Sequence, residues 1–410
     1  MNQSNRLRLG VITLWLMMVS HPTQAQDSLA TLINERLAHM KSVAAYKWIH
    51  GLRVEDLDRE AAVIEAATQA GLNHRIKVSS SEKFFQAQII AAKEIQHHWH
   101  KQWKIGNAPT TAPDLTAQIR PKLIELGNQI SSQLTSSNPI ALGTVTATGL
   151  TGATADNIAN AANNIEQYSN TLEQILDSGV IRVGTTFDYA PFSSQVVDND
   201  TFIPSGIDTD LARDLAASLD AEVIFVTTSW PTLMEDFSAG LFDIGMSGIS
   251  INLQRQQQAF FSDPYHSGGK TPIARCNMSD SFTSLEKIDQ SKTRVIVNPG
   301  GTNEKFIRAH IKHAQVILHQ DNRTIFEEIV DGNADVMITD AVEVLVQANV
   351  QKELCATMPG QTLTFQQKGY LLPQDSIWKN YIDAWLNQRQ GDGTVARLFK
   401  HHHANHQQTN

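Results

Sequence analysis

The stretch Val180-Ile181-Arg182-Val183-Gly184-Thr185-Thr186 is a short run rich in β-branched residues, and such runs favour a β-strand. Similar short runs recur further along the chain, and amphipathic stretches with helical spacing separate them. We expect strands at 180–186, 223–227, 295–297 and 336–338, and helices at 210–219, 232–239, 324–331 and 377–388. This alternation predicts an α/β fold with mostly parallel sheets.

The chain before this stretch has a different pattern. From Ser28 to about Gln133 the apolar residues follow the helical period, beginning with Leu29, Leu32, Ile33 and Leu37. A proline-containing loop at 109–113 precedes a last helix, which we expect at 115–134. The pattern predicts an all-α domain of about four helices, in front of the α/β domain.

A polar seam lies between these two patterns, at residues 138–170. Asp156 and Glu166 are its only charged residues, and Ala, Thr, Asn and Gly dominate its composition. Such a composition is typical of a linker with at most one weak helix. The expected organisation is multidomain, with a signal peptide (1–25), an all-α domain (26–137), a linker (138–170), an α/β domain (171–400) and a His-rich tail (401–410).

Length and composition support folded domains. At 410 residues the chain is longer than one hydrophobic core usually supports. Hydrophobic residues make up 41% and charged residues 18%, which excludes a fibrous or globally disordered protein. The formal net charge is −9 and no run of five or more Lys and Arg occurs, so we expect no nucleic-acid partner.

The N-terminus indicates the compartment. Arg6 and Arg8 precede an apolar run at 11–19, and Ala25 ends a small-residue cleavage site, which together predict a secretory signal peptide. The run is shorter than the ~20 apolar residues of a spanning helix, so we expect a periplasmic protein without a membrane anchor after cleavage. Cys276 and Cys355 are candidates for a disulfide there, and the sequence leaves open whether they pair.

Several polar residues of the helical half have spacings that favour a shared cavity. Arg36 and Lys47 are eleven residues apart, which returns to nearly the same helix face three turns later. Further candidates follow on the next two helices, namely Asp56 as an N-cap, Arg59, Glu60 and Gln96. Spacing alone leaves a second interpretation open, in which these residues are charges on solvated helix faces.

The sequence around these residues resembles the secreted, all-helical chorismate mutases of the gamma subclass. The matching segments are Glu35-Arg36-Leu37, Val43-Ala44-Ala45-Tyr46-Lys47-Trp48, Glu55-Asp56, Arg59-Glu60 and the stretch from Phe84-Phe85 to Gln96. The resemblance implies that Arg36, Lys47 and Arg59 hold the two carboxylates of chorismate. It also implies that Asp56 and Glu60 contact the ring hydroxyl side, and that Lys47 and Gln96 contact the ether oxygen. A homodimer through this domain is a further expectation from the family.

These residue types suit the reaction, because chorismate becomes prephenate by a unimolecular rearrangement that needs no nucleophile and no proton transfer. Cations select the compact reactive conformer, and donors at the ether oxygen stabilise the negative charge that develops there. Ala92 stands where the wider class often has a hydroxyl, and Gln129 stands where some members supply another arginine. Arg120 and Lys122 are the candidates to replace that arginine.

Three segments of the α/β half, 181–192, 206–211 and 243–255, resemble periplasmic amino-acid-binding proteins. In that family the residue that matches Arg255 clamps an α-carboxylate, and two lobes close on the ligand. A planar guanidinium at a helix start can pair with a carboxylate by two hydrogen bonds, so the residue type suits this role without the resemblance.

A closer resemblance, over about 172–399, is to the cyclohexadienyl dehydratases. It is carried by Thr228-Ser229-Trp230-Pro231, Gly269-Lys270-Thr271-Pro272-Ile273, Val297-Asn298-Pro299-Gly300-Gly301-Thr302-Asn303-Glu304-Lys305-Phe306 and Asp340-Ala341-Val342-Glu343. These enzymes convert prephenate to phenylpyruvate, and arogenate to phenylalanine, with loss of water and carbon dioxide. The resemblance implies that Glu343 donates the proton and that Arg255 holds the side-chain carboxylate. Further cleft residues implied in this way are Asp188, Trp230, Ser247, Lys270, Asn298 and Thr302.

Asp340 corresponds to the residue that meets the ammonium group in amino-acid binders, which would suit arogenate. The sequence leaves the choice between prephenate and arogenate open. Together the two resemblances predict a bifunctional enzyme of phenylalanine biosynthesis that acts on chorismate and then on prephenate. The alternative is an aromatic amino-acid receptor fused to a helical domain, which would need Arg255 and Asp340 but no acid such as Glu343. No cofactor is expected, and no metal site, because no carboxylate or cysteine at fixed spacing completes the histidine groups at 97–100 and 401–406.

Overall fold

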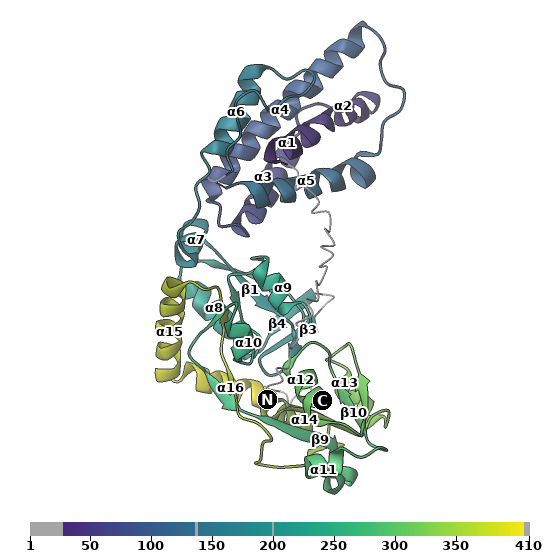
Figure 1. The fold of residues 1–410 in the computed structure, drawn as a ribbon, viewed down its shortest axis with the longest axis vertical. Coiled ribbons are helices and arrows are strands. Elements are labelled where there is room, and N and C mark those ends of the chain that lie inside the picture. The colour runs from purple at the N-terminus through teal and green to yellow at the C-terminus, as the bar shows by residue number, and fades with distance from the viewer. Residues whose placement is uncertain (1–27, 136–137, 199–200, 406–410) are drawn as a thin grey trace, which may run out of the picture.

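The computed structural model describes residues 28–135, 138–198 and 201–405, and the signal peptide expected at 1–25 lies outside them. Figure 1 shows an elongated molecule, with a helical domain at one end and an α/β domain at the other, joined through α7 (Thr171–Ser178). Both predicted fold classes are confirmed. In the described part of the chain no helix is long and apolar enough to cross a membrane.

The helical domain is formed by α1 (Leu29–Ala38), α2 (Met40–Ile49), α3 (Leu57–Leu72), α4 (Val78–Ile105), α5 (Arg120–Gln133) and α6 (Gly152–Asn163), with a π-helical turn at Leu115–Ile119. Only His39 separates α1 from α2, and its backbone keeps helical angles (φ −64°, ψ −17°). Helical geometry therefore continues from Arg36 to Lys47, as their eleven-residue spacing requires.

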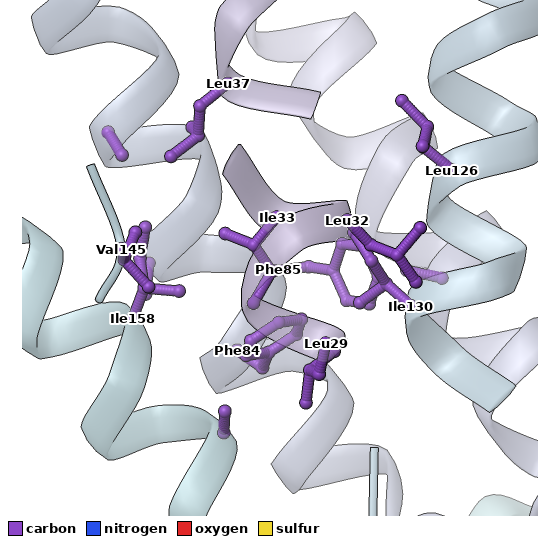
Figure 2. Close-up of a cluster of buried hydrophobic side chains, with 14 of the residues drawn as sticks. Leu29, Leu32, Ile33, Leu37, Phe84, Phe85, Leu126, Ile130, Val145 and Ile158 are labelled. Carbon is purple, nitrogen blue, oxygen red and sulfur yellow. The ribbon is translucent and has the colours of Figure 1, made fainter. Parts of the chain in front are cut away.

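The core of this domain forms where the apolar face of α1 meets α4 and α5. Phe84 and Phe85 of α4 lie against the leucine and isoleucine side chains of α1, and Leu126 and Ile130 of α5 close the other side (Figure 2). Because α1 has apolar residues at helical spacing, it can bury one whole face in this way.

The segment 138–170, which we expected to be a linker, is instead a packed part of the helical domain. Val145 and Ile158 belong to the same core cluster as α1 and α4 (Figure 2), and Ala155, Ala159 and Ala162 of α6 are buried with them. Small residues let α6 approach its neighbours closely without a bulky apolar stripe. The linker interpretation was wrong because a segment of small residues with few charges can also pack closely against a core.

The α/β domain contains two five-stranded sheets, one in each of two lobes. The first has the order β5-β1-β6-β15-β7, with strands Glu222–Thr227, Val180–Thr185, Ile244–Gly245, Leu371–Leu372 and Phe260–Phe261. The second has the order β11-β10-β12-β9-β13, with strands Gln315–Leu318, Arg294–Val297, Val336–Asp340, Lys270–Arg275 and Leu354–Ala356. In each sheet three neighbouring strands are parallel, as the alternating pattern predicted.

The chain passes between the lobes through a two-stranded antiparallel ribbon of β8 (His266–Gly268) and β14 (Gln366–Lys368). A smaller sheet is formed by β2 (Asp188–Tyr189), β3 (Ser193–Asp198) and β4 (Thr201–Ser205). The helices of the two lobes are α8 (Ile207–Ser218), α9 (Leu233–Ser238), α10 (Leu253–Gln256), α11 (Leu285–Ile288), α12 (Thr302–His310), α13 (Ile325–Val330), α14 (Ala341–Val350), α15 (Ser376–Gly391) and α16 (Thr394–Asn405).

Two further expectations concern the end of the chain and the cysteines. Residues 401–405 belong to α16 rather than to a separate His-rich tail, and His402 Nε2 lies 2.8 Å from a carboxylate oxygen of Asp210. Cys276 and Cys355 form a disulfide, which ties the end of β9 to β13 in the second lobe. The sequence left open whether these cysteines pair, and the structure shows that they do.

The two domains touch where the turn between α3 and α4 meets the first lobe. Arg182 of β1 pairs with Asp243 at 2.6 Å and also donates hydrogen bonds to Asn73 and to the Leu72 carbonyl of the helical domain. Arg75 of the same turn lies 3.4 Å from Asp375. Contacts of the buried Arg182 and of the partly exposed Arg75 thus link the helical domain to the first lobe.

Candidate functional sites

The helical domain contains a cavity of about 270 Å³ between α1, α2, α3, α4 and α5. Its lining includes every polar residue that the sequence suggested for this domain, namely Arg36, Lys47, Asp56, Arg59, Glu60 and Gln96. Helical continuity from α1 to α2 brings Arg36 and Lys47 into one wall. The remaining surface is mostly apolar, with side chains such as Val43, Val63 and Phe85.

Two buried cations stand at the polar end of this cavity. Arg36 donates a hydrogen bond of 3.0 Å to Gln88, and burial lowers the pKa of Arg36 to about 10. Lys47 donates to the carbonyl of Val54 at 2.6 Å. Burial also lowers the pKa of Lys47, and the charges of nearby carboxylates, Asp56 first, partly oppose this effect.

The start of α3 supplies the acidic side of the cavity. Asp56 caps the helix by accepting a hydrogen bond from the Arg59 backbone N–H at 3.2 Å, and the Asp56 backbone N–H donates in return to Glu60 at 3.3 Å. The reciprocal pair holds this first turn in place. The other carboxylate oxygen of Glu60 pairs with Lys93 of α4 at 2.8 Å.

Two polar atoms at the cavity are buried without a hydrogen-bond partner among the described residues. They are Nε of Arg36 and Oε1 of Gln96, while Nε2 of Gln96 donates to the Ala92 carbonyl at 3.1 Å. Unpaired buried polar atoms cost free energy, so they are typical of sites whose ligand completes the hydrogen bonding.

The cavity contains two further cations, namely Lys93, which the sequence did not suggest, and Arg120, which was a candidate for the additional cation. Lys93 lies three residues before Gln96, a helical spacing that would have placed it on the same face. Arg120 also lines the cavity, whereas Lys122 and Gln129 are not among its lining residues. Of the two candidates for the additional cation, the structure therefore places only Arg120 at the cavity. This set of cations can hold a small molecule with two carboxylates.

A second, much smaller cavity of about 20 Å³ lies between the two lobes of the α/β domain. Five of the residues suggested from the sequence line it, namely Trp230, Arg255, Asn298, Thr302 and Asp340. The lobes touch here, because Asn322 of the second lobe donates to the Asp188 carbonyl of the first at 2.9 Å. The hydroxyl of Tyr189 also crosses the cleft to Asp340.

Arg255 and Asp340 form the charged wall of the cleft. Arg255 is buried at the end of α10 and donates to the Ser250 carbonyl at 3.1 Å. Asp340 is bound by two ammonium groups, with Lys270 at 3.1 Å from one oxygen and Lys368 at 2.6 Å from the other. Burial alone would raise the pKa of Asp340, but the two lysines hold that pKa well below its usual range.

Glu343 lies behind this wall, in the first turn of α14. Its carboxyl accepts a hydrogen bond of 2.5 Å from Thr339, and its residue is only 2% exposed. Burial is the main reason why the pKa of Glu343 rises to about 8, and the negative charge of Asp340 adds to the effect. The carboxyl group is therefore largely protonated at neutral pH and can act as an acid.

Four of the suggested cleft residues do not line the small cavity itself. Lys270 reaches its edge and donates to Thr302 at 3.2 Å, and Asp188 accepts from the indole of Trp230 at 3.1 Å. Ser247 instead bonds within the first lobe to Thr186 and Ser193, at 2.8 and 2.6 Å. Glu343 is the fourth, as described above. Burial raises the pKa of Asp188 to about 6.

Sequence reasoning missed five residues that do line the cleft, namely Tyr189, Gly301, Asn303, Asn322 and Lys368. Tyr189 and Asn303 lie next to residues that were chosen, so proximity in the motif was an available signal. Lys368 gave no such signal in the sequence, because it lies on the short strand β14 and meets Asp340 only where the chain crosses between the lobes.

Two family models match the chain. Residues 181–405 match the bacterial extracellular solute-binding proteins of family 3, and residues 24–97 match the type II chorismate mutases. The first match covers the α/β domain, and the second ends near Gln96 in α4. The two matches therefore correspond to the two domains that carry the cavities.

Individual relatives resemble the α/β domain. A cyclohexadienyl dehydratase of Pseudomonas aeruginosa is 49% identical over 241 residues, which cover 59% of this chain and 89% of the relative. A histidine-binding periplasmic protein of Escherichia coli is 28% identical over 164 residues, covering 40% of this chain and 61% of the relative. The solved structure of an ancestral amino-acid-binding protein, described as a precursor of cyclohexadienyl dehydratase, is 32% identical with a TM-score of 0.52, covering 57% of this chain and 99% of that one.

Proposed function

The chain belongs to family 3 of the bacterial extracellular solute-binding proteins, and from this premise and the chorismate mutase match of its helical domain we propose a bifunctional enzyme. The helical domain converts chorismate to prephenate, and the α/β domain converts prephenate to phenylpyruvate. The observation that carries the proposal is the 49% identity to a cyclohexadienyl dehydratase in a chain that also has a mutase domain. The product of the first reaction is the substrate of the second.

In the mutase reaction one carbon–oxygen bond breaks while one carbon–carbon bond forms, and no proton or electron leaves the molecule. Arg36, Arg59 and Arg120 line the cavity, and we assign them to the two carboxylates of the compact conformer. Lys47 is the donor assigned to the ether oxygen, where negative charge grows as the bond breaks. Gln96 would support it through its amide.

In the dehydratase reaction Glu343 gives its proton to the ring hydroxyl, which leaves as water. The electron pair of the bond to the ring carboxylate moves into the ring, carbon dioxide departs, and the ring becomes aromatic. Glu343 then recovers a proton from water. A carboxyl with a pKa of about 8 is protonated before the reaction and can still transfer its proton. Arg255 is assigned to the side-chain carboxylate.

The receptor alternative is less well supported. A receptor for a zwitterion needs a free carboxylate for the ammonium group, and both oxygens of Asp340 are already bound by lysines. It also has no use for a buried acid such as Glu343. We further propose that the enzyme acts in the periplasm, in line with its solute-binding family, and that it dimerises through the helical domain.

The purified full chain should convert chorismate to phenylpyruvate without any added enzyme. Chorismate loss and phenylpyruvate formation can be followed together by chromatography. If prephenate accumulates, the α/β domain is not a dehydratase. If chorismate is unchanged while added prephenate is turned over normally, the helical domain is not a mutase.

A further inference from the structure

Lys368 takes an unusual position at the floor of the α/β cleft. Its ammonium group lies 2.6 Å from Asp340 and 2.9 Å from the hydroxyl of Ser250. The aromatic rings of Tyr189 and Phe192 lie 5.1 and 5.8 Å from the same nitrogen. Lys368 is 4% exposed, so this charge is held inside the protein at the cavity wall.

The backbone around Lys368 fixes the side chain there. Lys368 is paired with His266 in the ribbon between the lobes, and its carbonyl accepts a hydrogen bond of 3.0 Å from Tyr265. The Ser250 hydroxyl accepts a hydrogen bond from the Lys368 ammonium group, and the Ser250 carbonyl accepts one from Arg255. The loop that contains Ser250 therefore sets the distance between Arg255, which is assigned to the substrate carboxylate, and Lys368, which contacts Asp340.

The charges around the cleft are unbalanced in favour of cations. Arg255, Lys270 and Lys368 are all buried, and among the described residues Arg255 forms no ion pair with a carboxylate. Asp340 neutralises one of these charges, Asp188, whose pKa rises only to about 6, supplies a second negative charge, and Glu343 is mostly uncharged at neutral pH. One positive charge is left, so a ligand with a net negative charge and no cation suits the cleft, whereas an ammonium group would meet a second ammonium group at Asp340.

We propose that Lys368 is a specificity-determining residue, which occupies the ammonium position at Asp340 and so selects 2-keto acids over 2-amino acids. The inference rests on the proposed dehydratase function and names its substrate class. Prephenate, with a ketone beside its side-chain carboxylate, can accept a hydrogen bond from Lys368. Arogenate, with an ammonium group at that carbon, must displace Lys368 or remain next to it. This reverses the sequence-based expectation that Asp340 is available for the ammonium group of arogenate.

The test compares kcat/KM for prephenate and arogenate in the full chain and in Lys368→Met. The parent should prefer prephenate by about tenfold or more, which corresponds to about 1.4 kcal/mol. Lys368→Met keeps the length of the side chain and removes the ammonium group from the Asp340 oxygen that Tyr189 also contacts, so the preference should fall at least tenfold. Lys292→Met, which changes an exposed lysine of the second lobe, should leave the ratio unchanged. Equal use of both substrates by the parent, or an equal loss for both in Lys368→Met, would overturn the proposal.

Binding measurements separate this inference from the dehydratase proposal. Phenylpyruvate and phenylalanine differ at the 2-position only, and titration calorimetry gives their dissociation constants without turnover. The parent should bind phenylpyruvate about tenfold more tightly or better, and Lys368→Met should reverse or abolish the difference. If the parent binds phenylpyruvate more tightly than phenylalanine but turns over neither prephenate nor arogenate, the selectivity proposal stands and the dehydratase proposal is wrong. Thermal unfolding of the same samples, followed by circular dichroism, reports whether the α/β domain is folded, and Lys368→Gln replaces Lys368→Met if that variant does not fold.

Discussion

At the scale of single residues, the acid assigned to Glu343 predicts the pH dependence of the second reaction. Its pKa is raised to about 8, mainly by burial. Since the protonated form is the active one, kcat/KM for prephenate should be level below this pH and fall about tenfold per unit above it. Measurement of kcat/KM for prephenate between pH 6 and pH 10 checks this decline, and mutase turnover of the same sample is the control.

Glu343→Gln tests the same assignment by removing the transferable proton while keeping the size of the side chain. Turnover of prephenate should fall by roughly 10² to 10⁴, and the decline above pH 8 should vanish with it. Binding of prephenate should change little, because Arg255 and Lys368 remain. A variant that turns over prephenate at the parent rate would contradict the acid role.

Lys47 makes the corresponding prediction for the mutase. Its charge is assigned to the ether oxygen, where it acts mainly in the transition state, so Lys47→Ala should lower kcat for chorismate by roughly 10² to 10³. Lys83→Ala removes an exposed lysine of α4 and serves as the matched control. Dehydration of added prephenate should be the same in both variants, and a parallel loss of the two activities would argue against separate sites.

The helical-domain residues that the sequence pattern indicated share one property, which is a fixed relation to a local motif. Arg36 and Lys47 follow from helix periodicity, and Asp56 with Glu60 from capping. Lys368 could not be found in this way, because its contact with Asp340 depends on how two strands far apart in sequence cross between lobes. Burial of Glu343 was likewise invisible, since a glutamate in the first turn of a helix is ordinarily exposed.

At the scale of elements, α6 shows where composition misleads. The strands and helices of the α/β domain were predictable because β-branched runs and amphipathic stretches alternate there. The segment with α6 has few charges and many small residues, a pattern shared by linkers and by helices that pack closely. Only the contacts of Val145 and Ile158 with the core separate the two interpretations.

This packing predicts a large effect of a single substitution in α6. Ile158 is fully buried, so Ile158→Ala should reduce the free energy of unfolding of the helical domain by about 2 to 5 kcal/mol. Asn157→Ala, at an exposed position of the same helix, should change it by less than about 0.5 kcal/mol. Urea unfolding followed by circular dichroism gives both values. Equal effects of the two substitutions would mean that α6 is not part of the core.

At the scale of the whole molecule, the boundary between the domains moves from the predicted linker to the start of α7. Tyr168 lies at this boundary, where its backbone N–H donates to Arg75 of the helical domain and its hydroxyl donates to Asp177 of α7. Arg182 adds a contact from β1 to the α3–α4 turn. The two candidate cavities, by contrast, are each built within one domain.

The two domains should therefore be active as separate fragments, provided that α6 stays with the helical domain. A fragment of residues 26–168 keeps the whole core cluster of the helical domain and should retain chorismate turnover, and a fragment of 169–410 should retain prephenate turnover. A shorter fragment of 26–137 exposes the surface that α6 and Val145 cover, so it should unfold or lose activity. Thermal unfolding and turnover of the three fragments check this. Equal stability of the 26–137 and 26–168 fragments would restore the linker interpretation, whereas loss of both activities in folded fragments would mean that each domain needs the other for its chemistry.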